Sequence, residues 1–238
     1  MFAAMILAAG RGERMRPLTD TTPKPLLLAG GKPLIAWQIE ALARAGFRDI
    51  VVNASHLASH FAAALGDGAR FGVSLKWSIE LEALETAGGI ATALPLLPSG
   101  PVLIVSGDIW TSYDYARLRD RAVRMAVDLA SPRAHLVMVD NPPYHRRGDF
   151  ALTGDRIARD GPALLTFGNI GVYDTALFQQ LPRGVKHKLL PLYHEWIARG
   201  WVSGEHFTGL WSNVGTPADL AALDALVTNS PRCTTSQA

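Results

Sequence analysis

Cysteine is almost absent from this chain of 238 residues, and the single one, Cys233, lies in a polar C-terminal stretch. An internal disulfide framework and a thiolate metal site are therefore excluded, and the composition is consistent with a reducing compartment. No apolar run approaches the roughly 20 residues that a membrane span needs. Residues 1–9 are apolar but lack a basic leader, so we interpret them as a first strand rather than a signal peptide. We expect a soluble, cytoplasmic protein without a membrane partner.

Strong charge of either sign is also missing. The formal net charge is only +2, and charged residues make up 18% of the chain. No basic helix or run of Lys and Arg occurs, which excludes a nucleic-acid partner. The hydrophobic content of 48% is typical of a globular protein, and 238 residues suffice for one large α/β domain. We expect that single domain over residues 1–228, followed by a disordered tail over residues 229–238, which are polar and without periodicity.

Apolar runs and helical patterns alternate through the first half of the chain. Continuous apolar runs, which indicate strands covered on both faces, occupy residues 4–8, 50–53, 74–79 and 102–106, and helical patterns occupy residues 33–45, 57–65, 86–94 and 115–125. This alternation predicts an α/β fold with a doubly wound, mainly parallel (mixed) sheet in three α/β/α layers. In the less regular second half we predict strands at residues 135–139 and 164–173, a helix at 188–199, a strand pair within 205–214, and a last helix with Thr216 as its N-cap.

The loop after the first predicted strand combines glycine with positive charge. Gly10 and Gly12 break the apolar run, and the cations of the loop are Arg11, Arg14, Arg16 and Lys24. Glycine lets backbone N–H groups approach an anion closely, and open parallel sheets bind ligands at the carboxyl ends of their strands. The loop therefore predicts a phosphate site. It is neither a dinucleotide loop, because Met15 stands at the third glycine position, nor a Walker loop, because no Gly-Lys-Ser/Thr occurs.

A longer pattern around this loop is far more specific. The spaced motif L-A-A-G-x-G-x-R-M-x-P-L-T-x-x-x-P-K-P-L runs from Leu7 to Leu26. It closely resembles the N-terminal signature of the nucleotidyltransferases that join a nucleoside triphosphate to a sugar 1-phosphate. The resemblance implies the Rossmann-like nucleotide-diphospho-sugar transferase fold and a nucleotide site made by Leu7, Ala8, Ala9, Gly10, Gly12 and Arg14. It also implies catalytic roles for Arg14, which contacts the nucleotide phosphates, and for Lys24, which bridges toward the sugar phosphate.

Two further segments resemble the nucleoside-binding parts of this family. The segment Glu85-Thr86-Ala87-Gly88-Gly89-Ile90 is similar to its G-T-A-G-A segment, in which glycines pack beneath the base and ribose. The likeness implies that Gly88 binds the nucleotide, although Glu85 replaces the first glycine. Glu80 follows a predicted strand and resembles the base-reading position. The plain alternative for residues 85–90 is the start of a helix, and the plain alternative for Glu80 is a solvent-facing side chain.

Two predicted strand ends resemble the metal-binding motifs of the family. Val105-Ser106-Gly107-Asp108 is similar to the strand whose aspartate holds the catalytic Mg²⁺, although a lone carboxylate at a strand end is often a helix cap. In Trp211-Ser212-Asn213-Val214-Gly215-Thr216-Pro217, Asn213 replaces the aspartate that is the second metal ligand. An amide oxygen binds Mg²⁺ without contributing charge. Asn213 is therefore a neutral ligand, a water-mediated contact or the mark of an impaired enzyme.

The sugar-binding segments of the family have counterparts in the second half. Gly148-Asp149-Phe150 and Phe167-Gly168-Asn169-Ile170-Gly171 resemble them, which implies that Asp149 and Asn169 bind the sugar phosphate together with Lys24. Turn formation is the alternative for their glycines and asparagine. Some members of the family have an E-K-P segment whose lysine binds the sugar phosphate, and this sequence lacks it. Lys188 is a candidate replacement for that lysine, or else an ordinary exposed lysine. We predict no catalytic role for the seven histidines, which include His135, His145, His187, His194 and His206.

Within the family the chain most resembles the N-acetylmuramate-1-phosphate uridylyltransferases, through its short length and through segments such as residues 84–86, 107–111 and 202–206. That resemblance implies transfer of UMP from UTP to N-acetylmuramate 1-phosphate, with release of pyrophosphate, in peptidoglycan recycling. The alternatives are a guanylyltransferase acting on mannose or heptose 1-phosphate and a nucleotide-sugar-binding regulator without turnover. The implied partners are small-molecule substrates, and a monomer and a small homo-oligomer both remain open.

Overall fold

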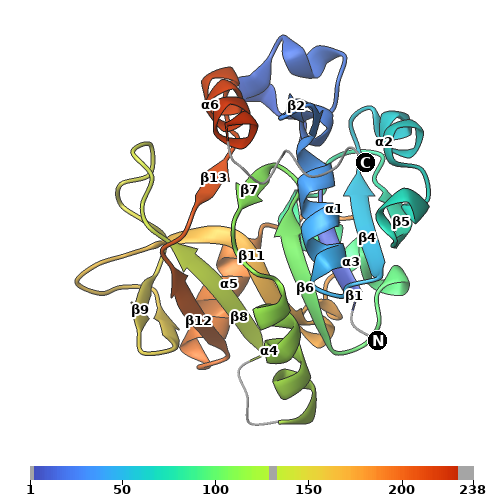
Figure 1. The fold of residues 1–238 in the computed structure, drawn as a ribbon. Coiled ribbons are helices and arrows are strands. Elements are labelled where there is room, and N and C mark those ends of the chain that lie inside the picture. The colour runs from blue at the N-terminus through green and yellow to red at the C-terminus, as the bar shows by residue number, and fades with distance from the viewer. Residues whose placement is uncertain (1–2, 129–132, 230–238) are drawn as a thin grey trace.

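The computed structural model describes residues 3–128 and 133–229, so residues 230–238 of the predicted disordered tail lie outside the described part of the chain. Nine strands of the described residues form one sheet in the order β5-β4-β1-β6-β11-β8-β12-β10-β9 (Figure 1). Its first half consists of parallel strands, β1 (Ala3–Leu7), β4 (Asp49–Ala54), β5 (Ser74–Ile79) and β6 (Pro101–Ser106). The predicted doubly wound α/β fold is confirmed, and these four strands lie within one residue of their predicted bounds.

The second half of the sheet is mixed. β11 (Thr166–Asp174) runs antiparallel to both of its neighbours, β6 and β8 (Ala134–Val139), whereas β12 (Val202–Phe207) runs parallel to β8. A hairpin of β9 (Ala151–Thr153) and β10 (Arg156–Ala158) completes the edge beside β12. We did not predict this hairpin, because strands of three residues are too short to show a hydrophobic period.

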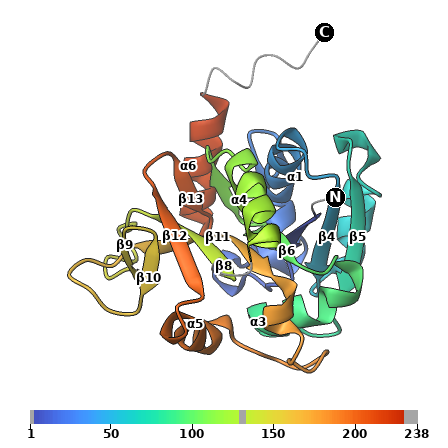
Figure 2. The same ribbon diagram turned by 90° about the horizontal axis from the view of Figure 1, so that it is seen from below.

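Helices cover both faces of the sheet (Figure 2). α1 (Leu34–Arg44), α2 (Ala58–Leu65) and α4 (Ala116–Val127) pack on one face, and α3 (Glu85–Ala93) and α5 (Leu189–Ala198) pack on the other. In β1, Ile6 belongs to the core under the first group and Met5 to the core under the second. Both side chains are fully buried, and each contributes roughly 1.5–3 kcal/mol by leaving water. The predicted three layers follow from this alternation.

Short 3-10 helices make up much of the connecting chain. They are η1 (Glu13–Met15), η2 (Leu18–Asp20) and η3 (Lys24–Leu26) in the first loop, and η4 (Ala69–Phe71), η5 (Leu94–Leu96) and η6 (Thr175–Phe178) elsewhere. None of the helices in the described ranges combines the length and apolar character that a membrane crossing requires.

The strand order changes direction between β1 and β6. From β1 the chain first builds outward through β4 and β5, and it then returns to the other side of β1 with β6. Gly107 donates its backbone N–H to the carbonyl oxygen of Leu7 at 2.9 Å, which holds the carboxyl ends of these two strands side by side. Ligands of open α/β sheets bind in the crevice at such a reversal. The fold therefore places a candidate site above β1 and β6.

The last helix anchors the first loop. α6 (Pro217–Thr228) starts after Thr216, which donates its backbone N–H to the Asp219 carboxylate at 2.8 Å and accepts the backbone N–H of Asp219 on its hydroxyl. This capping box confirms the predicted N-cap. Leu223 and Val227 of α6 form a small separate core with Met15, whose side chain is completely buried. The glycine loop is thus fixed by residues from the far end of the sequence.

Two short strand pairs stand outside the main sheet. They are β2 (Leu28–Ala29) with β3 (Lys32–Pro33), and β7 (Ile109–Thr111) with β13 (Trp211–Asn213). The predicted strand pair within residues 205–214 is wrong, because β12 joins β8 in the main sheet and β13 joins β7. Strands do occur in this range, but the sequence pattern does not encode their partners, which lie 68 residues away for β12 and 100–104 residues away for β13.

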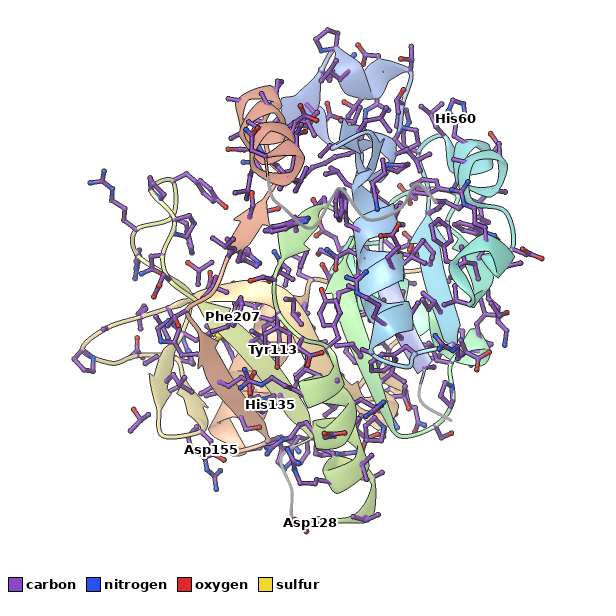
Figure 3. All side chains as sticks on the ribbon, viewed as in Figure 1. His60, Tyr113, Asp128, His135, Asp155 and Phe207 are labelled. Carbon is purple, nitrogen blue, oxygen red and sulfur yellow. The ribbon has the colours of Figure 1, made fainter. Side chains whose placement is uncertain are left out.

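A polar cluster lies beside α4, on the face of the sheet that α1 and α4 cover, where Figure 3 places Tyr113 and His135 close together. Both contact Glu205: the Tyr113 hydroxyl donates to one carboxylate oxygen, and His135 Nε2 lies 3.8 Å from the other. Arg117 approaches the same carboxylate at 3.3 Å. Burial alone would raise the pKa of Glu205, but hydrogen bonds from His135 and Tyr113 and the charge of Arg117 hold it below its ordinary value.

Candidate functional site

The glycine loop folds back on itself after β1. Gly12 adopts a φ of +70°, in the left-handed region that favours glycine, and the Thr19 hydroxyl donates to its carbonyl oxygen at 2.9 Å. A Cβ atom at Gly12 would stand only 3.0 Å from Cβ of Lys24. Glycine at this position therefore lets the two ends of the loop approach each other closely.

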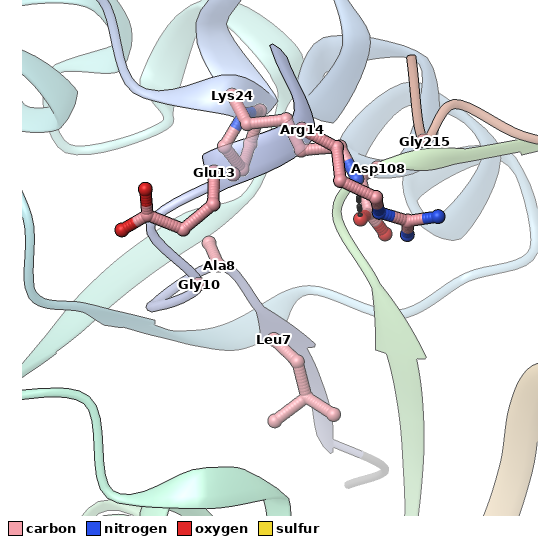
Figure 4. Close-up of a pocket in the computed structure, with 10 residues that line it drawn as sticks. Leu7, Ala8, Gly10, Glu13, Arg14, Lys24, Asp108 and Gly215 are labelled. Atoms are coloured by element: carbon pink, nitrogen blue, oxygen red, sulfur yellow. Dashed lines mark hydrogen bonds and ion pairs between the residues drawn. The ribbon is translucent and has the colours of Figure 1, made fainter. Parts of the chain in front are cut away.

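The loop encloses a cavity of about 270 Å³ at the end of β1, the loop cavity (Figure 4). Its lining residues are Leu7, Ala8, Gly10, Gly12, Glu13, Arg14, Lys24, Pro25, Asp108 and Gly215. The Glu13 carboxylate lies 2.8 Å from Nε of Arg11, which offsets its charge at the rim. Arg14 has no ion pair within the described ranges, and its guanidinium lies against Gly215. The cavity therefore offers an uncompensated cation to an anionic ligand.

Lys24 and Asp108 meet inside the loop cavity. The ammonium of Lys24 lies 2.6 Å from Oδ2 of Asp108, and the side chains are 10% and 27% exposed. Lys24 comes from η3, and Asp108 follows the carboxyl end of β6. The pair joins the two halves of the crevice and leaves the second oxygen of Asp108 without a bond to Lys24. A phosphate entering the cavity would compete with Asp108 for the ammonium.

Asn213 is brought next to Asp108 by the small sheet of β7 and β13. Asn213 pairs in register with Ile109, and the backbone N–H of Val214 donates to the carbonyl oxygen of Asp108 at 3.0 Å. The two predicted metal-binding residues therefore lie side by side, Asp108 directly before β7 and Asn213 at the end of β13, although they are far apart in sequence. Within residues 3–128 and 133–229, no group of three or more His, Cys, Asp or Glu side chains forms a metal site. A metal here would need further ligands from a substrate.

Two more cavities adjoin the loop cavity. The apolar cavity, about 170 Å³, is lined by Leu7, Thr86, Ile90, Ile104, Ser106, Phe167, Asn169, Tyr173, Leu189 and Tyr193. The aromatic cavity, about 330 Å³, is lined by Tyr144, His145, Asp149, Phe150, Thr166, Phe167, Asn169, Leu190, Tyr193, Trp211 and Asn213. Leu7 lines both the loop cavity and the apolar cavity, and Asn169 lines both of the other two. The three cavities therefore adjoin one another along the crevice.

An irregularity in β11 aims Asn169 at this crevice. The pairing of β11 with β8 shifts register between Phe167 and Gly171, and Asn169 has a φ of +57°. A bulge of this kind redirects a side chain, and asparagine tolerates the left-handed backbone better than most residues. Asp149 lies opposite, with one carboxylate oxygen accepting the backbone N–H of Phe167 at 2.8 Å. The structure thus brings the two predicted sugar-binding residues into one cavity.

Glu80 is buried beside the first loop rather than exposed. Its carboxylate accepts hydrogen bonds from Asn53 Nδ2 at 2.7 Å and from the backbone N–H of Leu84 at 3.0 Å. Burial raises the pKa of Glu80, and the hydrogen bonds from Asn53 and Leu84 oppose that shift. Asn53 in turn accepts the backbone N–H of Ala8 at 2.8 Å. Glu80 is therefore connected to the loop cavity through Asn53.

The predicted nucleotide-binding and sugar-binding residues do not all line the three cavities. Ala9, Glu80, Gly88 and Lys188 lie outside the linings. A Cβ atom at Gly88 would stand 2.3 Å from the carbonyl oxygen of Val185, so the packing of α3 against residues 184–188 requires glycine there. Lys188 is exposed at the N-cap of α5, directly before the cavity residue Leu189.

In the described part of the chain, three histidines lie close to carboxylates. His145 Nε2 lies 3.0 Å from Asp149 and His206 Nε2 lies 2.9 Å from Asp140, in addition to the contact of His135. The signal for the first pair was present in the sequence, since His145 precedes Asp149 by four residues. Tyr144, the residue before His145, also lines the aromatic cavity. Burial and the charge of Asp219 raise the pKa of Tyr144, and a hydrogen bond with Asn213 opposes that shift.

A glycine loop with cations at the strand reversal, facing a carboxylate across a crevice, is the arrangement of a site that binds the phosphates of a nucleotide. The chain belongs to the nucleotidyl transferase family, whose model matches residues 3–144. It is 46% identical over 227 residues to the N-acetylmuramate alpha-1-phosphate uridylyltransferase of Neisseria meningitidis serogroup B, covering 94% of this chain and 97% of the relative. The chain is accordingly a nucleotidyltransferase, as the sequence motifs predicted.

More distant relatives share less of their length or only their fold. The mannose-1-phosphate guanylyltransferase of Mycobacterium tuberculosis is 33% identical over 91% of this chain and 62% of its own length. The inositol-1-phosphate CTP transferase of T. maritima superposes with a TM-score of 0.76 at 18% identity, over 96% of each chain. These likenesses confirm the Rossmann-like fold of nucleotidyltransferases.

Proposed function

We propose that this nucleotidyltransferase transfers UMP from UTP to N-acetylmuramate 1-phosphate in the recycling of peptidoglycan. The observation that carries the proposal is the 46% identity to the Neisseria meningitidis uridylyltransferase over 97% of that relative. The guanylyltransferases of mannose 1-phosphate are matched at only 27–33% identity, and the chain spans 61–64% of their length. Overall length and identity therefore favour the uridylyltransferase.

The proposed reaction is an in-line displacement at phosphorus. A phosphate oxygen of the sugar 1-phosphate forms a bond to the α-phosphorus of UTP, the bond to the bridging oxygen breaks, and pyrophosphate leaves with the electron pair. The nucleophile is already ionised near neutral pH, so no general base is required. Catalysis then depends on positioning and on neutralising charge.

Arg14 and Lys24 are the catalytic residues in this proposal. The guanidinium of Arg14, which has no ion pair in the described part of the chain, would stabilise the leaving pyrophosphate together with backbone N–H groups of the loop. Lys24 would transfer its ammonium from Asp108 to the reacting phosphates and hold them together against their mutual repulsion. Both roles draw support from the shared position of the two cations in the loop cavity.

The remaining roles follow the three cavities. Leu7, Ala8, Ala9, Gly10 and Gly12 would hold the nucleotide from β1 and the loop, with Glu80 and Gly88 on the side of its base. Asp149, Asn169 and Lys188 would bind the sugar phosphate from the opposite side of the crevice.

The metal in this proposal is Mg²⁺, with Asp108 and Asn213 as its protein ligands. The residues fit such an ion, because both supply oxygen donors and only one Asp108 oxygen is bonded to Lys24. Mg²⁺ typically binds through one or two protein groups and substrate phosphates. When bound, it supplies positive charge beside the α-phosphate. Asn213 would contribute a neutral ligand, so the site carries one negative charge less than a pair of carboxylates.

The test is pyrophosphate release across a matrix of substrates. UTP, dTTP, GTP and CTP are each paired with N-acetylmuramate, glucose and mannose 1-phosphates in the presence of Mg²⁺. We expect the highest kcat/KM for UTP with N-acetylmuramate 1-phosphate. A preference for GTP with mannose 1-phosphate would instead establish the guanylyltransferase. Nucleotide binding without pyrophosphate release on any sugar would establish the regulator.

A further inference from the structure

The aromatic cavity has the composition of a site for a sugar ring. Five of its lining residues are aromatic, namely Tyr144, Phe150, Phe167, Tyr193 and Trp211. Aromatic rings pack against the apolar C–H faces of a sugar, while a small number of polar groups fix its orientation. The cavity has about 330 Å³ of space, and Asp149 supplies its carboxylate. The recognition of sugar donor groups therefore depends on how Asp149 is held.

Two donors of this chain hold Asp149 from different sides. The backbone N–H of Phe167 donates to Oδ2 at 2.8 Å, and Nε2 of His145 donates to Oδ1 at 3.0 Å. A carboxylate has about four acceptor positions, so two remain for a ligand. The Asp149 side chain is 35% exposed, which leaves it accessible. Without His145, a single contact would hold the carboxylate, whose terminal torsion is broad.

The segment that carries His145 is itself anchored. The backbone N–H of His145 donates to the carbonyl oxygen of Pro142 at 2.8 Å. The Asn141 amide donates to the carbonyl oxygen of Leu164 at 2.8 Å, and the Thr166 hydroxyl donates to Asn141 Oδ1 at 2.8 Å. The imidazole is therefore presented to Asp149 from a fixed turn.

We propose that His145 is a positioning residue for sugar recognition. Its imidazole fixes the Asp149 carboxylate in the orientation that accepts hydrogen bonds from hydroxyl or amide N–H groups of a sugar 1-phosphate. The inference rests on the proposed function, because it assigns the aromatic cavity to the sugar. It adds a residue that lines the aromatic cavity and acts on the sugar through Asp149.

The test measures the binding of N-acetylmuramate 1-phosphate by calorimetry in wild type, His145→Ala and His145→Gln. We expect His145→Ala to raise the Kd about tenfold, because a hydrogen bond to a charged group is lost. Glutamine keeps an N–H donor at nearly the same reach, so His145→Gln should recover most of the affinity. In steady-state assays the KM for the sugar 1-phosphate should rise in His145→Ala, while kcat and the KM for UTP stay within about twofold.

The matched control is His206→Ala. His206 makes a similar contact, with Asp140 at 2.9 Å, but it does not line the cavity, so its removal should leave the sugar Kd unchanged. An unchanged Kd in His145→Ala, equal losses in the alanine and glutamine variants, or a parallel rise in both KM values would each overturn the inference. A wild type that binds no sugar 1-phosphate would overturn it as well. Binding without pyrophosphate release would contradict only the proposed function.

Discussion

Two glycines of the first loop should separate folding from binding when each is replaced by alanine. Gly12 has a φ of +70°, and an added Cβ would stand 3.0 Å from Lys24 Cβ and 3.1 Å from Thr19 Cγ2. A left-handed backbone without glycine costs of order 1–3 kcal/mol. For a protein of this size that corresponds to a fall in Tm of about 2–12 °C. Gly10→Ala meets no atom within 4 Å, so its stability should stay within about 0.5 kcal/mol of wild type.

Gly10→Ala should show its effect in nucleotide binding instead of in stability. Gly10 lines the loop cavity, where a methyl group would occupy space beside the phosphates. We expect the KM for UTP to rise about tenfold in Gly10→Ala, equivalent to about 1.4 kcal/mol, with an unchanged Tm. The comparison uses thermal unfolding for the Tm, and pyrophosphate release assayed well below the Tm of each variant. This reasoning would be refuted by a Gly12→Ala protein with the Tm of wild type, or by a Gly10→Ala protein with the Tm of Gly12→Ala.

Three further predictions concern the charged groups. Lys24→Ala should lower turnover more than 100-fold, because the loss of one preorganised contact to developing charge costs about 2.7–4 kcal/mol; Lys32→Ala, which breaks a pair with Glu40 outside the loop cavity, is the control. Asn213→Asp should lower the Mg²⁺ concentration for half-maximal rate, and unchanged rate and Mg²⁺ dependence would place Asn213 away from the metal. The lowered pKa of Glu205 stabilises the fold above the ordinary carboxyl pKa, and that stability is lost as the pH falls through the lowered value. Denaturant titrations should therefore show that Glu205→Gln has a lower free energy of unfolding than wild type near neutral pH. Its free energy of unfolding should also fall less than that of wild type as the pH is lowered, and an equal fall in both proteins would contradict this.

Sequence periodicity predicted the main sheet well because its strands are buried on both faces. Strands of this kind form continuous apolar runs, as in β1, β4 and β6. The short strands β7, β9, β10 and β13 have only three residues each, so they carry no such signal. The partner of β13 is decided by tertiary contacts with β7. The single domain over residues 1–228, the oligomeric state and the cytoplasmic location remain predictions.

For the candidate site, the sequence was most informative where one segment supplies several groups. The loop from Gly10 to Lys24 combines its glycines and cations within one stretch, and its motif placed Arg14 and Lys24 correctly in a single cavity. The chain of contacts from Glu80 through Asn53 to Ala8 was not predictable, because it joins three separate strand ends. His145 was missed because its partner Asp149 was considered only as a sugar ligand.

The contact between α6 and the glycine loop has a consequence for the order in which the protein matures during synthesis. Met15 leaves the ribosome 208 and 212 residues before Leu223 and Val227, which pack with it. Gly215, against which Arg14 lies, also belongs to this late segment. A nascent chain that has made most of its sheet therefore still holds an unanchored loop. Competence to bind nucleotide should arise only when α6 packs against this loop, so nascent chains that still lack α6 would not sequester UTP.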